Sequence, residues 1–186
     1  SCNGLSLLLV LSIVMSLFVV AASANNIEKF TDGAELDPKY EEATDLVIGL
    51  GIIKGNDKNE LNPTDNVSRS EAAKIVAYLN LGEKSAEAYK ARKVYDDLEA
   101  DNWAAGYVAF GNDSGIINGY GNGKFGPDDA ITREQICVMM DKYIQYHDAN
   151  NDTKYLDRNA SVTFKDASDI SSWANASVQK CVSYGL

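Results

Sequence analysis

The feature that most constrains this 186-residue chain is an internal repeat. The five residues from Gly51 to Gly55 (GIIKG) return 64 positions later, from Gly115 to Gly119 (GIING). Further pairs of matching residues are also 64 positions apart, so the two copies align here with no insertion or deletion: Pro63 and Pro127, Asp65 and Asp129, Ser68 and Thr132, Arg69 and Arg133. One spacing that holds over so many positions indicates duplicated structural units, and it outranks any local assignment of secondary structure.

Part of a third copy lies near the C-terminus. Trp103 stands twelve positions before Gly115, and Trp173 stands twelve positions before Gly185. The third copy stops at Gly185-Leu186, so we expect it to be truncated. The predicted organisation is a first repeat at 25–81, a linker at 82–94, a second repeat at 95–147, a polar linker at 148–163 and a truncated third repeat at 164–186.

Each copy is expected to fold as helix, loop and helix. The first helix ends at a glycine that can adopt a left-handed conformation, and a Gly/Asn/Asp-rich loop follows. The second helix begins at a capping box, Ser68-x-x-Glu71 or Thr132-x-x-Gln135. Its apolar stripe recurs at helical spacing: Ala72, Ile75, Val76 and Leu79 in the first copy, and Ile136, Met139, Met140 and Tyr143 in the second.

The sequence therefore predicts an all-α fold of tandem repeats. No single copy can cover its own stripe, whereas packing the long helices of three copies together would bury all three. We expect a helical bundle with approximate threefold symmetry and with grooves between the copies.

The N-terminal segment is typical of a secretory signal. Leu7 to Ala24 is nearly all apolar and ends in Ala22-Ser23-Ala24, so we expect 1–24 to be a signal peptide with an incomplete start, cleaved rather than kept as a membrane anchor. This segment holds no charged side chain, so the mature part keeps the net charge of −10. Such a chain repels nucleic acid and anionic membranes, which argues against both as partners.

Two arginines occupy an unfavourable position. Arg69 and Arg133 each follow the cap at a helix N-terminus, which already carries partial positive charge. One interpretation is a site for a carboxylate or phosphate, formed by arginine and free helix N–H groups. The other is a structural salt bridge, for instance to Asp97 or Asp129, and the two interpretations are compatible.

Aromatic and glycine residues give further candidates with two interpretations each. Trp103 and Trp173 open the first helices of their copies, where they would either stack on sugar rings or anchor the core. Gly55 and Gly119 would either allow a ligand to approach the backbone or satisfy a turn.

The sequence indicates neither a metal site nor a cofactor. Cys137 and Cys181 are the only cysteines after residue 24, and both lie in apolar helical patterns. They are expected to be buried thiols, although a disulfide between them is possible. Two cysteines and one histidine, His147, with no paired spacing, make no zinc site.

Taken together, these motifs resemble the S-layer homology (SLH) domain family. The second copy matches that family's pattern along its whole length: Tyr95-Asp96-Asp97, Trp103-Ala104, Gly115-Ile116-Ile117-Asn118-Gly119, Gly123-Lys124-Phe125-Gly126-Pro127 and Ile131-Thr132-Arg133-Glu134-Gln135. The first copy has Phe30-x-Asp32, but Lys39-Tyr40 replaces Trp-Ala. The resemblance covers nearly everything from Phe30 onward.

The resemblance implies non-covalent anchoring of a secreted protein to a bacterial cell wall, a task that requires no enzyme activity. Such domains form a pseudo-threefold helical prism and bind secondary cell wall polysaccharide, which is linked to peptidoglycan and often carries pyruvate ketals. The implied location is the wall or S-layer of a Gram-positive bacterium. Carried over by position, the ligand contacts are Arg69, Arg133, Asp97, Trp103, Gly119, Asp166 and Trp173, with Asp32 and Gly55 as first-copy counterparts.

Two other functions, calcium binding and glycoside hydrolysis, are less well supported by the sequence. Asp148-x-Asn150-x-Asp152 has the first spacings of a calcium loop, as in dockerin modules, but Thr153 and Asn159 stand where such a loop needs Gly and Glu. A glycosidase needs two facing carboxylates, and no pair stands out here. The chain could also be the non-catalytic part of a wall-associated enzyme.

Overall fold

The computed structural model describes residues 25–151, 154, 160 and 162–186. The predicted signal segment 1–24 lies outside these residues, and so does part of the predicted linker 148–163. In the described part of the chain the regular elements are all helices, which confirms the predicted all-α class. The chain divides into two compact units, Ser1–Asp65 and Asn66–Leu186.

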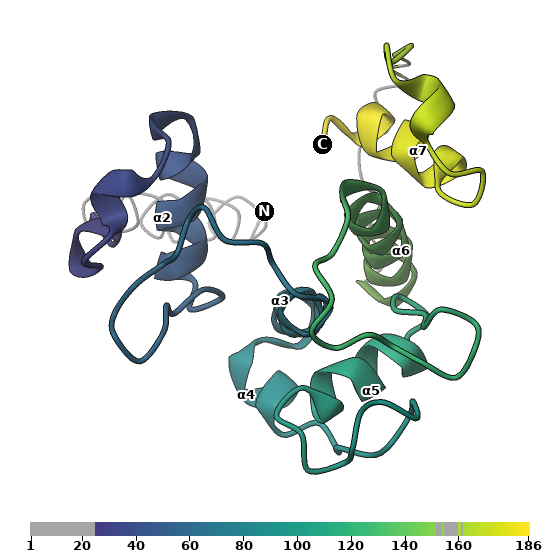
Figure 1. Cartoon of the computed structure of the whole chain (residues 1–186), viewed down its shortest axis with the longest axis horizontal. Helices are drawn as coiled ribbons and strands as arrows, with labels where there is room; N and C mark the ends of the chain where they lie inside the picture. Colours follow the sequence, from purple (N-terminus) through teal and green to yellow (C-terminus); the bar gives the residue numbers. More distant parts are fainter. Residues whose placement is uncertain (1–24, 152–153, 155–159, 161) are drawn as a thin grey trace, which may run out of the picture. The chain divides into compact units, whose positions relative to one another are not determined.

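In its described part, residues 25–65, the first unit holds three short 3₁₀ helices and one α-helix. These are η1 (Ile27–Lys29), η2 (Gly33–Glu35), η3 (Pro38–Tyr40) and α2 (Glu41–Gly49), shown in purple and blue in Figure 1. Ile27 and Phe30 are its buried apolar side chains, whereas no residue of α2 is buried. The backbone N–H of Asn26 donates to the carboxylate of Asp45, which ties the start of this unit to α2.

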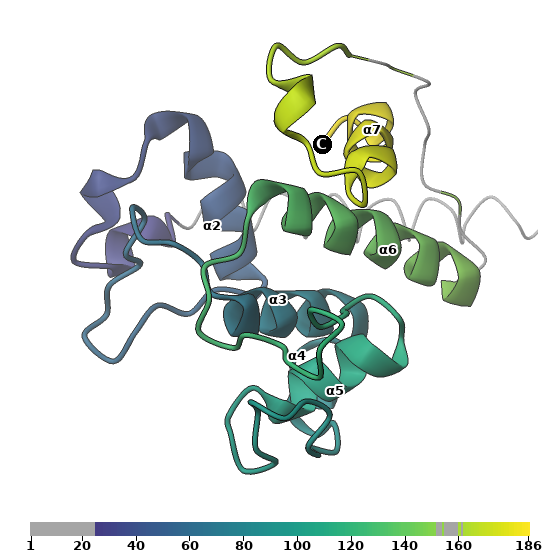
Figure 2. The same cartoon turned by 45° about the vertical axis from the view of Figure 1, so that its right-hand side comes forward.

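The second unit is built around two long helices. It contains α3 (Arg69–Leu81), α4 (Glu83–Glu87), α5 (Ala105–Asp113), α6 (Arg133–Asn151), η4 (Ala167–Asp169) and α7 (Asn175–Tyr184). Helix α6 packs against both α3 and α7, and α5 packs against α3 and α4 (Figure 2). Phe125, Leu98, Ile116, Ile117 and Val108 are fully buried and form the centre of its core.

The helix ends agree with the sequence. Helices α2, α5 and α7 are followed by Gly51, Gly115 and Gly185, whose φ angles of 71°, 71° and 84° are left-handed. Ser68 and Glu71 form a complete capping box, and Thr132 and Gln135 exchange the equivalent two hydrogen bonds. The predicted starts of α3 and α6 are therefore confirmed.

The predicted apolar stripe is only partly correct. Ala72, Val76 and Met139 are buried, but Leu79 and Ile136 are 36% and 41% exposed. On α3 the most buried side chains are Ala73 and Ala77, at 0% exposure. These small residues allow α5 to pack closely, so the buried face of α3 is rotated from the stripe that the largest apolar residues suggested.

The segment 82–94 was expected to be a linker, yet it contains α4. This short helix packs against α3 and α5, and the hydroxyl of Tyr78 on α3 donates to the carboxylate of Glu87 at 2.7 Å. The ring of Tyr78 also meets that of Tyr107 on α5 edge to face, with 5.9 Å between centroids. The boundaries of the repeats and the threefold arrangement of the copies stay predictions.

Candidate functional site

Arg69 is the first residue of α3, and its side chain is only 4% exposed. Nε donates to the carbonyl of Phe125 at 2.7 Å, and one terminal nitrogen donates to the carbonyl of Asn118 at 3.1 Å. The other donates to Oε1 of Gln135 at 3.2 Å. The guanidinium also lies over the rings of Tyr120 and Phe125, 4.6 and 4.8 Å from their centroids. Arg69 of the first copy is thus held inside the loop of the second.

This environment corrects the salt-bridge interpretation of Arg69. The partners of its side chain are two backbone carbonyls and one amide oxygen, and neither Asp97 nor Asp129 is among them. Asp129 contributes through its backbone instead, because its carbonyl accepts the N–H of Arg69 at 2.9 Å. A bridge between Ser68 and Ala130 continues this pairing. The structural role of Arg69 is to join one copy to the next.

Asp97 and Asp32 have the same structural role in their two copies. The carboxylate of Asp97 accepts the backbone N–H groups of Phe125 and Gly126 at 2.8 and 2.9 Å. The carboxylate of Asp32 accepts those of Leu61 and Asn62 at 2.8 and 2.6 Å. Each aspartate thereby clasps the loop of its own copy, and contact of either carboxylate with a ligand stays a prediction.

The pKa values of both aspartates reflect this clasp. For Asp32 the hydrogen bond from Leu61 has the largest effect and lowers the pKa. For Asp97 burial acts to raise the pKa, but the backbone N–H groups of Phe125 and Gly126 together outweigh it, so this pKa is lowered as well. Both side chains are therefore ionised and bonded at neutral pH.

Gly55 and Gly119 are required by packing. A Cβ at Gly119 would lie 2.4 Å from both the carbonyl oxygen of Lys124 and the ring of Tyr95. At Gly55 it would lie 2.4 Å from the ring of Phe30, and φ there is +72°. In both copies the space beside the glycine is filled by the aromatic residue that opens the copy. Packing against the aromatic ring therefore accounts for both positions, with the left-handed φ as a second reason at Gly55, and Gly119 also lines a groove.

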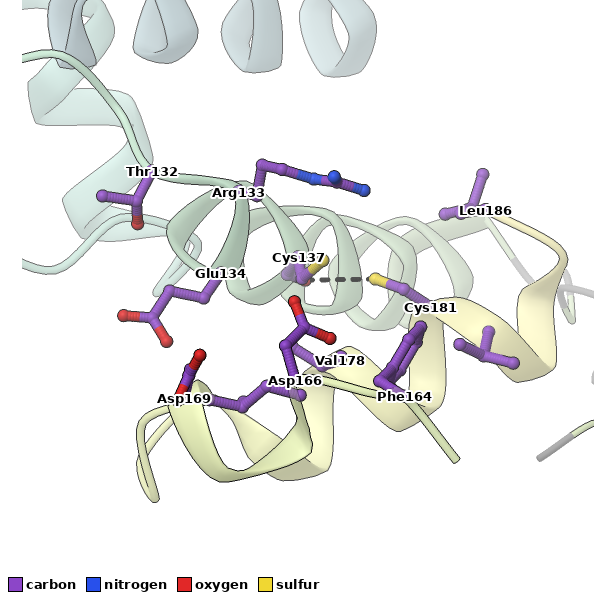
Figure 3. Close-up of a pocket in the computed structure, with 12 residues that line it drawn as sticks. Thr132, Arg133, Glu134, Cys137, Phe164, Asp166, Asp169, Val178, Cys181 and Leu186 are labelled. Carbon is purple, nitrogen blue, oxygen red and sulfur yellow. Dashed lines mark hydrogen bonds between the residues drawn. The ribbon is translucent and has the colours of Figure 1, made fainter. Parts of the chain in front are cut away.

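Two cavities lie in the second unit. The first, which we call the α6–α7 groove, has a volume of about 550 Å³ and is shown in Figure 3. It is lined by Thr132, Arg133, Glu134, Cys137, Phe164, Asp166, Asp169, Ile170, Val178, Cys181, Val182 and Leu186. The second, the Arg69 groove, has a volume of about 400 Å³. It is lined by Arg69, Ile116, Asn118, Gly119, Tyr120, Gln135, Val138, Met139, Lys142 and Trp173.

The two grooves differ in charge. Arg69 and Lys142 line the Arg69 groove, and no carboxylate is among its lining residues. In the α6–α7 groove, Arg133 shares the walls with the carboxylates of Glu134, Asp166 and Asp169 (Figure 3). Glu134 accepts hydrogen bonds from the backbone N–H and the hydroxyl of Ser171, both at 3.0 Å. The Arg69 groove is the one suited to an anion.

The two tryptophans are surface residues. Trp103 and Trp173 are each 57% exposed, so the interpretation as core anchors is wrong for both. Trp173, from the third copy, lines the Arg69 groove. Trp103 lines neither cavity and lies next to Tyr107, with 6.3 Å between ring centroids. The structure thus brings Arg69, Gly119 and Trp173 together, places Arg133 and Asp166 in the other groove, and leaves Trp103 outside both.

Three residues of the Arg69 groove escaped the sequence analysis. Lys142 adds the second cation. The side-chain amide of Asn118 is satisfied when its oxygen accepts from Nζ of Lys142 and its nitrogen donates to the carbonyl of Ile117. Tyr120 forms a wall, and its hydroxyl donates to the carboxylate of Asp129 at 2.8 Å. Tyr120 could have been noticed as the aromatic residue that directly follows Gly119. Lys142 gave no signal, because a lysine near the middle of a helix usually faces solvent.

Metal and membrane sites find no support in the described residues. There, no group of three or more His, Cys, Asp or Glu side chains is arranged to hold a metal ion. The calcium-loop alternative depends partly on Asp152, Thr153 and Asn159, which lie outside the described residues. Among the described helices, none combines the length and apolar character that crossing a membrane requires.

Comparison with known proteins agrees with the repeat. The family model for the S-layer homology domain matches residues 29–73 and 94–137. An endoglucanase of Bacillus sp. (strain KSM-635) is 31% identical over 96% of this chain, which covers 18% of that protein. The surface-layer 125 kDa protein of Lysinibacillus sphaericus is 26% identical over 94% of the chain, which covers 13% of that protein.

A third relative is the cellulosome-anchoring protein of Acetivibrio thermocellus. It is 28% identical over 50% of this chain, which covers 21% of that protein. The chain therefore spans less than a quarter of the length of each of these relatives. The two matched segments contain the two copies that share the 64-residue spacing, and each holds its own clasping aspartate. With two such domains in tandem, the chain belongs to the S-layer homology domain family.

Proposed function

We propose that this chain anchors a secreted protein to the bacterial cell wall by binding an acidic wall polysaccharide in the Arg69 groove. The observation that carries this proposal is the composition of that groove, which combines two cations and an exposed tryptophan with no carboxylate. Its volume of about 400 Å³ lies within the range of sites for small ligands. A sugar unit bearing an acidic group is a ligand that such a groove can recognise.

The cations of the groove have separate tasks. Three of the five N–H donors of an arginine are used by Arg69 to hold the protein together. Arg69 lines the groove and is fixed in direction by the three hydrogen bonds and two rings. Lys142 is half-buried on α6 and supplies an ammonium group beside Asn118. A ligand carboxylate would therefore meet a guanidinium and an ammonium group.

The aromatic walls supply contact with the sugar ring. Trp173 presents an exposed indole face, and Tyr120 forms another wall of the same groove. Aromatic faces bury apolar area against the C–H face of a sugar, and an indole gives the largest such area. The groove mixes residues of all three copies: Arg69 from the first, Gly119 and Lys142 from the second, and Trp173 from the third.

The finer identity of the ligand rests on the family resemblance. A pyruvate ketal on secondary cell wall polysaccharide has the carboxylate that Arg69 and Lys142 would bind. The α6–α7 groove is a poorer candidate, because its three carboxylates would repel an anionic polymer despite Arg133.

The relatives support a surface location. They include proteins named for the surface layer and for cellulosome anchoring, which agrees with the predicted export of this chain to the wall or S-layer of a Gram-positive bacterium. The endoglucanase matches over only 18% of its own length, so the match leaves most of that protein uncovered. We therefore propose a non-catalytic role for this chain.

Sedimentation with wall sacculi tests the proposal. The purified protein is mixed with sacculi that carry pyruvylated polymer, and with sacculi stripped of polymer by hydrofluoric acid. We expect co-sedimentation with the first and none with the second. Lys142→Met and Trp173→Ala should each weaken binding by about tenfold or more, as loss of one charged or aromatic contact does.

Two matched variants serve as controls. Lys84→Met removes the same charge from exposed α4, and Trp103→Ala removes an equally exposed tryptophan that lines neither groove. Both should bind as the parent does. Equal sedimentation with stripped sacculi would show that the polymer is not the ligand. Equal losses in Trp103→Ala and Trp173→Ala would show that the Arg69 groove is not the site.

A further inference from the structure

The side chains of Cys137 on α6 and Cys181 on α7 meet at the wall of the α6–α7 groove. The thiol of Cys181 donates to the backbone carbonyl of Cys137 with 3.3 Å between sulfur and oxygen. Figure 3 shows the sulfur of Cys181 directed at Cys137, and the dashed line marks this contact. Both cysteines are among the residues that line this groove.

We propose that Cys137 and Cys181 are a disulfide-forming pair that joins the second copy to the third. Both sulfur atoms belong to helices that pack together, so the bond would form between elements already in contact. Ser177 on α7 supports the same packing, since its hydroxyl donates to the carboxylate of Asp141 on α6 at 2.7 Å. Predicted export would place the pair where disulfides persist.

The two cysteines differ in solvent access, so we expect Cys137 to react with an external disulfide before Cys181 does. Cys137 is half-buried and lines a cavity of about 550 Å³, whereas Cys181 is only 4% exposed. Burial, together with Cys137, raises the pKa of Cys181 to about 12, so its thiol is a poor first nucleophile. The Cys137 sulfur, which lines the cavity, is therefore the group that meets an incoming disulfide reagent.

The proposed reaction is a thiol–disulfide exchange with an external disulfide, either a small molecule or an oxidoreductase. The Cys137 sulfur attacks one sulfur of that disulfide, breaks its S–S bond and releases the first thiol. The Cys181 thiol then loses its proton and attacks the Cys137 sulfur, which releases the second thiol. The two cysteines are oxidised, and the two sulfur atoms of the reagent are reduced.

The bond would hold α7 on α6 and close the chain from 137 to 181. A crosslink that closes a long loop lowers the conformational entropy of the unfolded chain. In the chain-entropy description, this stabilisation of the folded state grows with the length of the loop. Trp173 stands two residues before α7 begins, so the same bond would fix its position at the Arg69 groove.

Peptide mapping after oxidation tests the pair. The purified protein is incubated with oxidised glutathione, unfolded, alkylated with iodoacetamide and digested without reductant. We expect a linked peptide pair containing Cys137 and Cys181, and no alkylation at either residue. Reduction with dithiothreitol should then lower the melting temperature by about 5 to 10 °C. Full alkylation of both cysteines, or a crosslink only between separate chains, would overturn the proposal.

Cys137→Ala is the matched control, because the half-buried position tolerates truncation better than buried Cys181. In this variant the reductant should leave the melting temperature unchanged. A fall of the same size in Cys137→Ala and in the parent would assign the stabilisation to something other than this bond, which would also overturn the proposal. The test does not involve the polysaccharide, so it stands apart from the proposed function.

Discussion

Arg69 and Arg133 occupy the same position of the repeat but have different surroundings. Arg69 is buried among oxygen atoms and rings of the second copy, whereas Arg133 is exposed at the α6–α7 groove. The reason lies in the loop of the second copy: the segment from Asn118 to Phe125 packs over Arg69. The same residue type therefore serves the structure in one copy and remains available at the surface in the other.

This difference predicts unequal effects on stability. Arg69→Ala would remove the donor to the buried carbonyl of Phe125 and to the part-buried oxygens of Asn118 and Gln135, and it would open space beneath Tyr120 and Phe125. We expect a loss of about 3 kcal/mol in the free energy of unfolding. Arg133→Ala should change it by less than about 0.5 kcal/mol, as exposed substitutions usually do. Urea unfolding monitored by circular dichroism measures both, and similar losses would contradict the contrast.

The sequence could predict both arginines as helix-start residues, but not which one would be buried. The capping boxes are local, and each needs only four consecutive residues. Burial of Arg69 depends on carbonyl groups 49 and 56 positions away, at Asn118 and Phe125. For the same reason Lys142 was missed, since only the fold brings it beside Arg69.

At the scale of elements, the loop of each copy is fixed from two sides. An aspartate near the start of the copy binds the N–H groups of the loop, and an aromatic residue fills the space beside its glycine. In the second copy these are Asp97 and Tyr95, and the ring of Tyr95 stacks on that of Phe125 with 5.6 Å between centroids. The loop is therefore anchored to the core at Gly119 and Phe125, and its residues 118–120 line the groove.

Two glycine substitutions distinguish packing from backbone conformation. Gly119→Ala would place a Cβ against the Lys124 carbonyl and the stacked ring of Tyr95, neither of which can move freely. We expect it to lower the free energy of unfolding by about 2 to 3 kcal/mol. Gly115→Ala meets open space, but φ of +71° makes it cost about 1 kcal/mol. Thermal melts of both variants measure the difference, and a larger loss in Gly115→Ala would refute this account of Gly119.

The sequence predicted the elements better than their packing. Helix starts and glycine stops follow from local chemistry, and the structure confirms them. The buried face of α3 was misjudged because Ala73 and Ala77 contribute little to an apolar pattern, yet their small size is what allows α5 to approach. The 64-residue spacing likewise suggested a linker at 82–94, where α4 packs instead.

At the scale of the whole molecule, the net charge of −10 opposes an acidic ligand. Attraction is confined to the Arg69 groove, where two cations lie without a carboxylate among the lining residues. Long-range repulsion is screened by salt over about 8 Å at physiological ionic strength, whereas partly desolvated contacts are screened much less. Binding should therefore depend on local contacts and not on the overall field.

The dependence of binding on salt follows from this balance. Raising sodium chloride from 50 to 300 mM should change the dissociation constant for polymer-bearing sacculi by less than about threefold. Screening weakens the general repulsion and the local attraction together, so the two changes largely cancel. Sedimentation at several salt concentrations measures this. A fall in affinity of about a hundredfold would indicate binding through many exposed charges instead.

The paired roles of Asp97 and Arg69 give the array a polarity. The aspartate closes a copy on itself, while the arginine reaches forward into the loop of its successor. At this junction the second copy is closed by its own aspartate and offers a socket to Arg69 of the copy before it, whereas Arg133 is exposed and lines the α6–α7 groove. Changing the order of the copies would therefore have a structural cost. If the second copy stood first, no arginine would precede it, and the socket that Arg69 fills would stay empty.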